Sequence, residues 1–224
     1  RHDLVRNSGV AQRHVRAGQI GRGGFERAVL EAIAGDAMTL GLMQAMLRAR
    51  AALWVEYLAL NKLVVQITMR DALCRRFMAI PGVGPVTALS FSTAIEDPAR
   101  FRRSRDVAAY FGLTSKRWQS GTSIDVKGRI SKAGDPDVRR ALYEAASAML
   151  TRFKGSDILK SWGLKLAKTK CHAKARVAVA RKLAVVMHAM WRDGTNYVGD
   201  PTASAQDVAA RASAKEKRLS YAQS

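Results

Sequence analysis

Apolar residues between positions 25 and 76 recur at spacings of three and four residues. This spacing places them on one side of a helix and predicts a long helical segment with a heptad-like seam. Such a seam suits a coiled-coil hairpin or a contact between two copies of the chain, and a helix packed on its own domain explains it equally well. The seam consists of Leu42, Met46, Ala49, Leu53, Tyr57, Leu60, Val64 and Ile67.

The next apolar stretch, FMAIPGVGPVTALSFSTAI at residues 77–95, is interrupted by glycine and proline. We expect a helix to end near Ile80, Gly82 and Gly84 to form a tight turn, and Pro85 to begin a new helix. The pattern resembles a helix-hairpin-helix, in which the turn presents backbone N–H groups to a phosphate. A plain connection between two helices is the alternative.

Shorter elements follow. A turn at Asp97 precedes Ser104, which we expect to cap a short helix. Residues 114–131 lack a helical period and contain Gly121 and Gly128, so we predict a loop with a short β-hairpin.

Three further helices are expected at residues 136–153, 156–168 and 172–193, and the first of them begins at an Asp-Pro pair. The last helix carries an apolar stripe for the core and a basic opposite side. The stripe is Val177, Ala180, Ala184, Met187 and either Met190 or Trp191.

These patterns predict a mainly α protein: a helical bundle with a long coiled-coil-like segment, a helix-hairpin-helix and a short β-hairpin loop. We expect three parts along the chain. Residues 1–74 form a helical connector, residues 75–198 form a domain that contains the helix-hairpin-helix, and residues 199–224 form a disordered tail.

Charge narrows the possible partners. The 224 residues include 38 Lys or Arg and 18 Asp or Glu, a net charge of +20. Between residues 100 and 182 there are 21 basic and 6 acidic side chains, so most of the excess lies in the middle and later part of the chain. A positive field of this size favours polyanions, most commonly nucleic acid, and an anionic membrane surface is the competing partner.

The cysteines and histidines argue against a metal site. Cys74 and Cys171 are far apart and belong to no CxxC pattern, and none of the four histidines clusters with either of them. This usage indicates no zinc site and a reducing, cytoplasmic compartment. The longest apolar stretch is interrupted by Glu56, Asn61 and Lys62, so no membrane span is expected.

The stretch KRWQSGTSIDVKGRISKAGD, residues 116–135, places Ser120 among basic residues. A serine hydroxyl can attack phosphorus in a phosphodiester, provided that cations stabilise the charge on the phosphate oxygens. By composition alone Ser120 is as well explained as a turn residue, and Ser123 and Ser131 offer the same chemistry. The candidate phosphate-binding residues are Gly82, Gly84, Lys116, Arg117, Lys127, Arg129, Lys132, Arg139 and Arg140.

An ordered set of motifs carries a resemblance to a known family. It comprises IPGVGP followed by TA, F-x-x-S-x-x-x-A-A-Y-x-G-L, Q-S-G, G-R-I-S-K-x-G and V-R-R-A-L. Over residues 75–197 the chain resembles the C-terminal domain of insertion-sequence transposases of the one-ten and one-sixteen type, the Piv and MooV relatives.

The resemblance implies a recombinase that cuts and rejoins DNA through a serine, which falls on Ser120. In that family an N-terminal RuvC-like domain carries acidic metal ligands, and some members use a structured guide RNA. We find no such acidic domain in residues 1–74, so we expect a C-terminal part that is inactive alone, with Mg²⁺ required only together with the other domain. The partners expected are DNA, a structured guide RNA and a second copy of the chain through the helical segment.

The sequence also fits two other functions. A helix-hairpin-helix module that binds DNA without chemistry needs the basic surface but no serine nucleophile. An RNA-binding scaffold shares the same positive charge.

Overall fold

The computed structural model describes residues 22–33, 35–120, 124–199 and 213, and for residues 22, 23, 117–120 and 124–127 it describes the backbone only. Within these ranges the chain forms α-helices α1 to α8, one short 3-10 helix and one two-stranded sheet, which confirms the mainly α prediction. The chain divides into two compact units, Arg1–Leu60 and Asn61–Ser224. None of the described helices is both long enough and apolar enough to cross a membrane.

The first unit contains α1 (Arg22–Ala32) and most of α2 (Ala37–Arg70). Asp36 starts α2 by accepting hydrogen bonds from the N–H groups of Met38 and Thr39, at 3.1 and 3.2 Å. The guanidinium of Arg50 lies 4.7 Å from the centroid of the Phe25 ring and 3.5 Å from the carboxylate of Glu26. α1 therefore folds back against α2, and the predicted helical segment is divided into α1, which ends at Ala32, and α2, which begins at Ala37.

The apolar seam of α2 is largely uncovered. Leu42, Met46, Leu53 and Leu60 are 62%, 65%, 71% and 62% exposed, and Tyr57 is also exposed. The alternative in which this seam packs on its own domain is therefore wrong for these residues, and a contact with a second copy stays a prediction.

The second unit begins with the end of α2, followed by α3 (Ala72–Met78) and α4 (Pro85–Ile95). The carboxylate of Asp71 caps α3 by accepting from Leu73 N at 2.7 Å. Pro85 occupies the first turn of α4, as predicted from its fixed φ.

A 3-10 helix (Pro98–Arg100), α5 (Ser104–Tyr110) and the strands β1 (Ser115–Ser120) and β2 (Ile124–Ile130) come next. The predicted hairpin is thus confirmed. The prediction that Ser104 caps α5 is wrong: Arg103 is the N-cap residue, and the Ser104 hydroxyl lies 3.0 Å from His188 Nδ1 instead.

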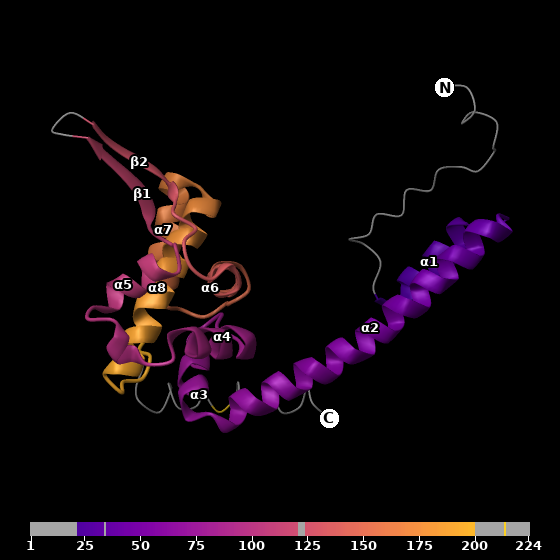
Figure 1. Ribbon diagram of the computed structural model, residues 1–224, viewed down its shortest axis with the longest axis horizontal. Coiled ribbons are helices and arrows are strands. Elements are labelled where there is room, and N and C mark those ends of the chain that lie inside the picture. Colours follow the sequence, from indigo (N-terminus) through magenta and orange to yellow (C-terminus); the bar gives the residue numbers. More distant parts are fainter. Residues whose placement is uncertain (1–21, 34, 121–123, 200–212, 214–224) are drawn as a thin grey trace. The chain divides into compact units, whose positions relative to one another are not determined.

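Three helices complete the second unit: α6 (Pro136–Thr151), α7 (Ile158–Lys170) and α8 (His172–Arg192). α8 packs against α5, α6 and α7 (Figure 1) and supplies much of the core. Four positions of its predicted stripe are buried, whereas Val177 is only half-buried and its neighbour Val179 is fully buried. The buried residues of α8 are Ala175, Val179, Ala180, Leu183, Ala184, Met187, His188 and Met190.

The chain beyond α8 returns to the start of α7. The carbonyl of Gly199 accepts a hydrogen bond from Ile158 N at 2.7 Å. The Tyr197 hydroxyl donates to the buried carboxylate of Asp157 at 2.8 Å. Gly199 is the first residue of the predicted disordered tail, and residues 200–212 and 214–224 lie outside the described residues.

Candidate nucleic-acid interface

The candidate site is the two-stranded hairpin that carries Ser120. β1 and β2 are antiparallel, and Ser120, the last residue of β1, is opposite Ile124 (Figure 1). The register shifts between Ser115 and Arg117, and three residue steps on β2 match two on β1 there. Gly128 lies within this stretch of β2, where a glycine tolerates the bulge. The side chain of Ser120 and the whole of Ser123 lie outside the described residues.

The hairpin register places like charges opposite each other. Arg117 pairs with Lys127 across the two strands, and Lys116 and Arg129 are their neighbours in sequence. Like charges in directly opposed positions destabilise a sheet in the absence of a counter-ion. The same register pairs Gln119 with Asp125, so one acidic position lies close to these cations.

Four of the predicted cations have described, exposed side chains. Arg140 forms an ion pair with Asp137, and the other three are Lys116, Arg129 and Lys132. Among the side chains that the structure describes, none of the three has a carboxylate partner within ion-pair distance. Their charge is therefore available to a ligand.

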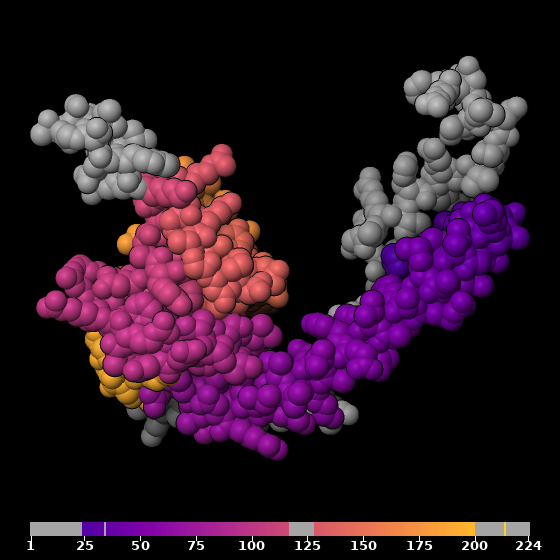
Figure 2. Space-filling view, in the orientation of Figure 1, coloured from indigo at the N-terminus to yellow at the C-terminus, as the bar shows by residue number. Residues whose placement is uncertain are grey.

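The base of the hairpin is fixed by backbone hydrogen bonds. Ser131 N donates to Thr114 O at 2.8 Å, and Lys132 N donates to Gly112 O at 3.1 Å. Gly112 has φ +66°, and a Cβ there would strike the backbone of Ala133. Figure 2 shows the surfaces of α5 (magenta) and α6 (pink to orange) on the face of the second unit that is in view. These hydrogen bonds form a junction between the residues that follow α5 and the loop that precedes α6, and the hairpin extends from it.

Arg139 has a structural task at this junction. Its Nη1 donates to Phe111 O at 3.1 Å and to Ala133 O at 2.8 Å, so one guanidinium nitrogen joins the end of α5 to the loop before α6. Arg140, one residue later, is exposed and forms an ion pair with Asp137 at 2.9 Å. Sequence reasoning assigned both residues to phosphate and missed the clamp, because its partners are backbone atoms from distant positions.

The glycine turn before α4 has two different surroundings. Gly82 has φ +87°, and a Cβ there would strike Ala145 O and Met149 N of α6. Gly84 has an ordinary extended φ of −106° and open space around it, and no side chain caps α4 after it. The close approach at Gly82 serves packing within the domain, whereas the backbone at Gly84 is open to a ligand.

The titratable groups do not build a metal site. Among the described residues, no three His, Cys, Asp or Glu side chains come close enough to hold a metal ion. The described residues therefore supply no ligand set for the Mg²⁺ that the resemblance implies together with the other domain.

The sequence did not predict two polar groups in the interior, the buried His188 and the half-buried Tyr197. His188 is fully buried in α8, and its Nε2 lies 3.0 Å from the carbonyl of Pro98. Because a carbonyl only accepts, Nε2 is the donor in this contact, and the hydroxyl of Ser104 lies 3.0 Å from Nδ1. Burial and the adjacent Asp157 carboxylate raise the pKa of Tyr197, which keeps its hydroxyl as a donor. The signal for His188 was its position one turn after Ala184 on the apolar stripe.

Together, the fold and the site define a basic helical domain that presents a cationic β-hairpin on a rigid base. Residues 74–162 match the family model described as "Transposase IS116/IS110/IS902 family". This stretch of the chain is therefore similar to that transposase family.

Known proteins support this assignment. The "Transposase for insertion sequence element IS1111A" of Coxiella burnetii is 37% identical over 118 residues, which is 52% of this chain and 32% of that protein. The "Putative transposase y4pF/y4sB" of Sinorhizobium fredii is 30% identical over 140 residues, 62% of this chain and 36% of that protein. The "Pilin gene-inverting protein" of Moraxella bovis is 29% identical over 119 residues, 53% and 36% respectively. The matched stretch spans about a third of the length of each of these relatives.

Proposed function

We propose that this chain acts on DNA as part of a transposase that cuts and rejoins strands, with Ser120 as the nucleophile. The observation that carries the proposal is the position of Ser120, at the end of β1 in a cationic hairpin of a domain that is similar to this transposase family. The related pilin gene-inverting proteins bear a name that refers to DNA inversion, which is consistent with strand exchange.

In the proposed step the Ser120 Oγ attacks the phosphorus of a phosphodiester. A bond forms between Oγ and phosphorus, and the bond between phosphorus and the 3′ oxygen breaks. The serine loses its proton, and the released 3′ oxygen gains one to become a hydroxyl. The DNA is left joined to the protein as a phosphoserine, so the reverse reaction rejoins a strand without ATP.

The cations of the hairpin supply the electrostatic part of the reaction. Negative charge on the non-bridging oxygens must be stabilised in the transition state, and Arg side chains can hold a phosphate through two parallel hydrogen bonds. Arg117, Lys127 and Arg129 are the residues of β1 and β2 proposed for this role. Lys116 and Lys132 extend the same positive surface toward the base of the hairpin.

The test is the capture of a covalent protein–DNA adduct. Because the family resemblance implies a second, acidic domain, this chain would replace the matching third of the Coxiella burnetii relative in a chimaera. End-labelled substrate DNA is incubated with the chimaera and separated on a denaturing gel. We expect an adduct that disappears with Ser120→Ala.

Ser123→Ala and Ser131→Ala are the matched controls, because each removes one hydroxyl from the same basic segment. Both are expected to retain the adduct. Loss with Ser123→Ala and retention with Ser120→Ala would move the nucleophile to position 123. Tight DNA binding without any adduct would favour a binding module that lacks chemistry.

The proposal extends to the partners. The exposed seam of α2 supports self-association, because large apolar side chains on one helix face gain by burial against a second copy. A structured guide RNA is implied by the resemblance for some family members. Competition between structured RNA and duplex DNA at one salt concentration distinguishes an RNA carrier from a DNA-only binder.

A further inference from the structure

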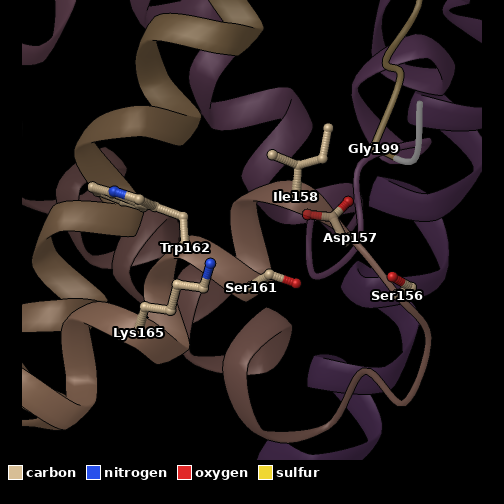
Figure 3. A pocket seen from close by; sticks show the side chains of 7 residues that line it. All are labelled: Ser156, Asp157, Ile158, Ser161, Trp162, Lys165 and Gly199. Atoms are coloured by element: carbon tan, nitrogen blue, oxygen red, sulfur yellow. The ribbon is translucent and has the colours of Figure 1, made fainter.

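A groove runs along the outer face of α7, away from the hairpin strands in sequence. Its first part is a hollow of about 290 Å³, shown in Figure 3, and its second part is a hollow of about 310 Å³. The two parts share Ser161 and Lys165, so they form one surface, here called the α7 groove. Trp162 and Ile158 line the first part, and Lys168 and His172 line the second.

The spacing of residues along α7 gives this helix a buried face and an exposed face. Leu159, Gly163 and Ala167 recur every four residues and are buried. A Cβ at Gly163 would strike the side chains of Val179 and Leu150, so α7 lies unusually close to its neighbours there. Ile158 and Trp162 are displaced to the outer face and remain 54% and 41% exposed.

An indole exposed to this extent is a preformed flat surface with no ring partner among the described residues. In Figure 3 the ammonium group of Lys165 lies between Trp162 and Ser161, and the Trp162 ring extends away from Ser161. The groove therefore offers an aromatic face, an ammonium group and a hydroxyl within one helical turn.

The charge around the groove is of one sign. Residues 158–192 contain nine Lys or Arg side chains and no Asp or Glu. The ammonium group of Lys160 donates hydrogen bonds to the carbonyls of Phe153 and Gly155. Lys165 and Lys168 are exposed and have no carboxylate partner in the described part of the chain. The surface is therefore complementary to a polyanion.

Asp157 is the one carboxylate among the lining residues, and it does not cancel the positive charge of the groove. Asp157 is only 2% exposed, and both of its oxygens are engaged. Oδ1 accepts from Lys160 N at 3.0 Å, and Oδ2 accepts from the Tyr197 hydroxyl at 2.8 Å. Asp157 thus caps the start of α7 and binds the returning chain at Tyr197, and it presents little charge to the groove.

We infer that the α7 groove binds single-stranded DNA, with an unpaired base stacked on Trp162 and the adjoining phosphates held by Lys165 and Lys168. Aromatic side chains among cations are the usual platform for unpaired bases, because every base has a flat π face. A base within a duplex is already stacked on its neighbours and cannot reach an indole in a small hollow. This inference rests on the proposed action on DNA, where strand cutting and rejoining exposes unpaired nucleotides.

The experiment measures binding of the full chain to a fluorescently labelled oligothymidylate by anisotropy, with duplex DNA and oligouridylate as the other probes. Trp162→Leu keeps an apolar side chain and removes the aromatic face, and it is expected to weaken oligothymidylate binding about tenfold. Trp162→Phe keeps a ring and is expected to stay within about threefold of the unchanged chain. Circular dichroism confirms that both variants fold.

The salt dependence separates stacking from charge. Lys165→Gln is expected to reduce the slope of log affinity against log salt concentration by about 0.7, the value for one phosphate contact on a single strand. Trp162→Leu should leave that slope unchanged. Lys62→Gln is the matched control, since it removes one exposed positive charge from α2, outside the groove.

Each outcome decides the matter. If Trp162→Leu changes the affinity for oligothymidylate by less than twofold, the α7 groove is not the binding site for single-stranded DNA. The proposed function is not affected by that result. Absence of binding to both single-stranded and duplex DNA overturns the proposed function together with this inference. Tighter, Trp162-dependent binding of oligouridylate overturns the choice of DNA and assigns the groove to RNA.

Discussion

Gly82 and Gly84 lie two residues apart, but only Gly82 has a backbone conformation and a close contact that exclude a side chain. At Gly82 the positive φ is unfavourable for any residue with a Cβ, and that Cβ would also meet the backbone of α6. We expect Gly82→Ala to lower the free energy of unfolding by about 2–4 kcal/mol, through strain and displacement of α6. Denaturant unfolding followed by circular dichroism measures this change.

Gly84→Ser is the control for that substitution. Gly84 has an extended backbone, open space and the N-cap position of α4, where serine is a preferred residue. Its effect should stay within about 0.5 kcal/mol. Equal losses at the two positions would contradict the assignment of Gly82 to helix packing.

The two cysteines should differ in reactivity. Burial raises the pKa of Cys74 to about 11, while Cys171 is exposed between α7 and α8. Because only the thiolate is nucleophilic, iodoacetamide near neutral pH should modify Cys171 and spare Cys74 in the folded chain. Mass spectrometry of the peptides measures this, and unfolding in guanidinium should make both residues reactive. Early labelling of Cys74 in the folded state would contradict its buried position.

At the scale of elements, the hairpin depends on how its base is anchored. Arg139 joins Phe111 O and Ala133 O, so Arg139→Ala would leave two carbonyls without this donor. We expect a loss of about 1–3 kcal/mol in the free energy of unfolding. Arg140→Ala removes the same charge from the next residue but breaks only an exposed ion pair, and it should cost less than about 0.5 kcal/mol.

The comparison of Arg139→Ala with Arg140→Ala also distinguishes an effect on the position of the hairpin from a direct electrostatic effect on DNA binding. Both remove one positive charge, so a purely electrostatic role in DNA binding would weaken affinity similarly in each. A larger loss of both stability and affinity for Arg139→Ala is expected if the clamp positions the hairpin. Equal stability of the two variants would show that the clamp is unimportant.

Element boundaries were predictable where local chemistry sets them. Pro85 and the Asp135–Pro136 pair predicted the starts of α4 and α6 correctly, because proline is pre-set for a first helical turn. The end of α2 and the start of α3 at Asp71 were missed, because the apolar pattern continues through this point. Ser104 was misassigned for another reason: its hydroxyl is used by His188, 84 positions away.

At the scale of the whole chain, the sequence predicted the helical class and the basic hairpin but not what covers each surface. The clamp of Arg139 and the exposure of Trp162 depend on contacts between distant segments, which no local pattern contains. The charge pattern was informative over longer ranges, since the acid-free run from residue 158 to 192 is visible in the sequence alone. The sequence alone does not show that Trp162 is exposed on the outer face of α7 among these cations, and this exposure is what suggests a site for an unpaired base.

The seam of α2 provides the last prediction. Burial of a leucine side chain contributes about 1.5–3 kcal/mol, so a face with several exposed leucines favours association of two copies. We expect concentration-dependent self-association in sedimentation velocity, and Leu53→Glu should raise the dissociation constant at least about tenfold by placing a charge in the contact. Gln44→Glu adds the same charge to an exposed position of α2 outside the seam, and it should leave association nearly unchanged. A chain that stays monomeric at all concentrations, or equal weakening by both variants, would contradict a specific contact through the seam.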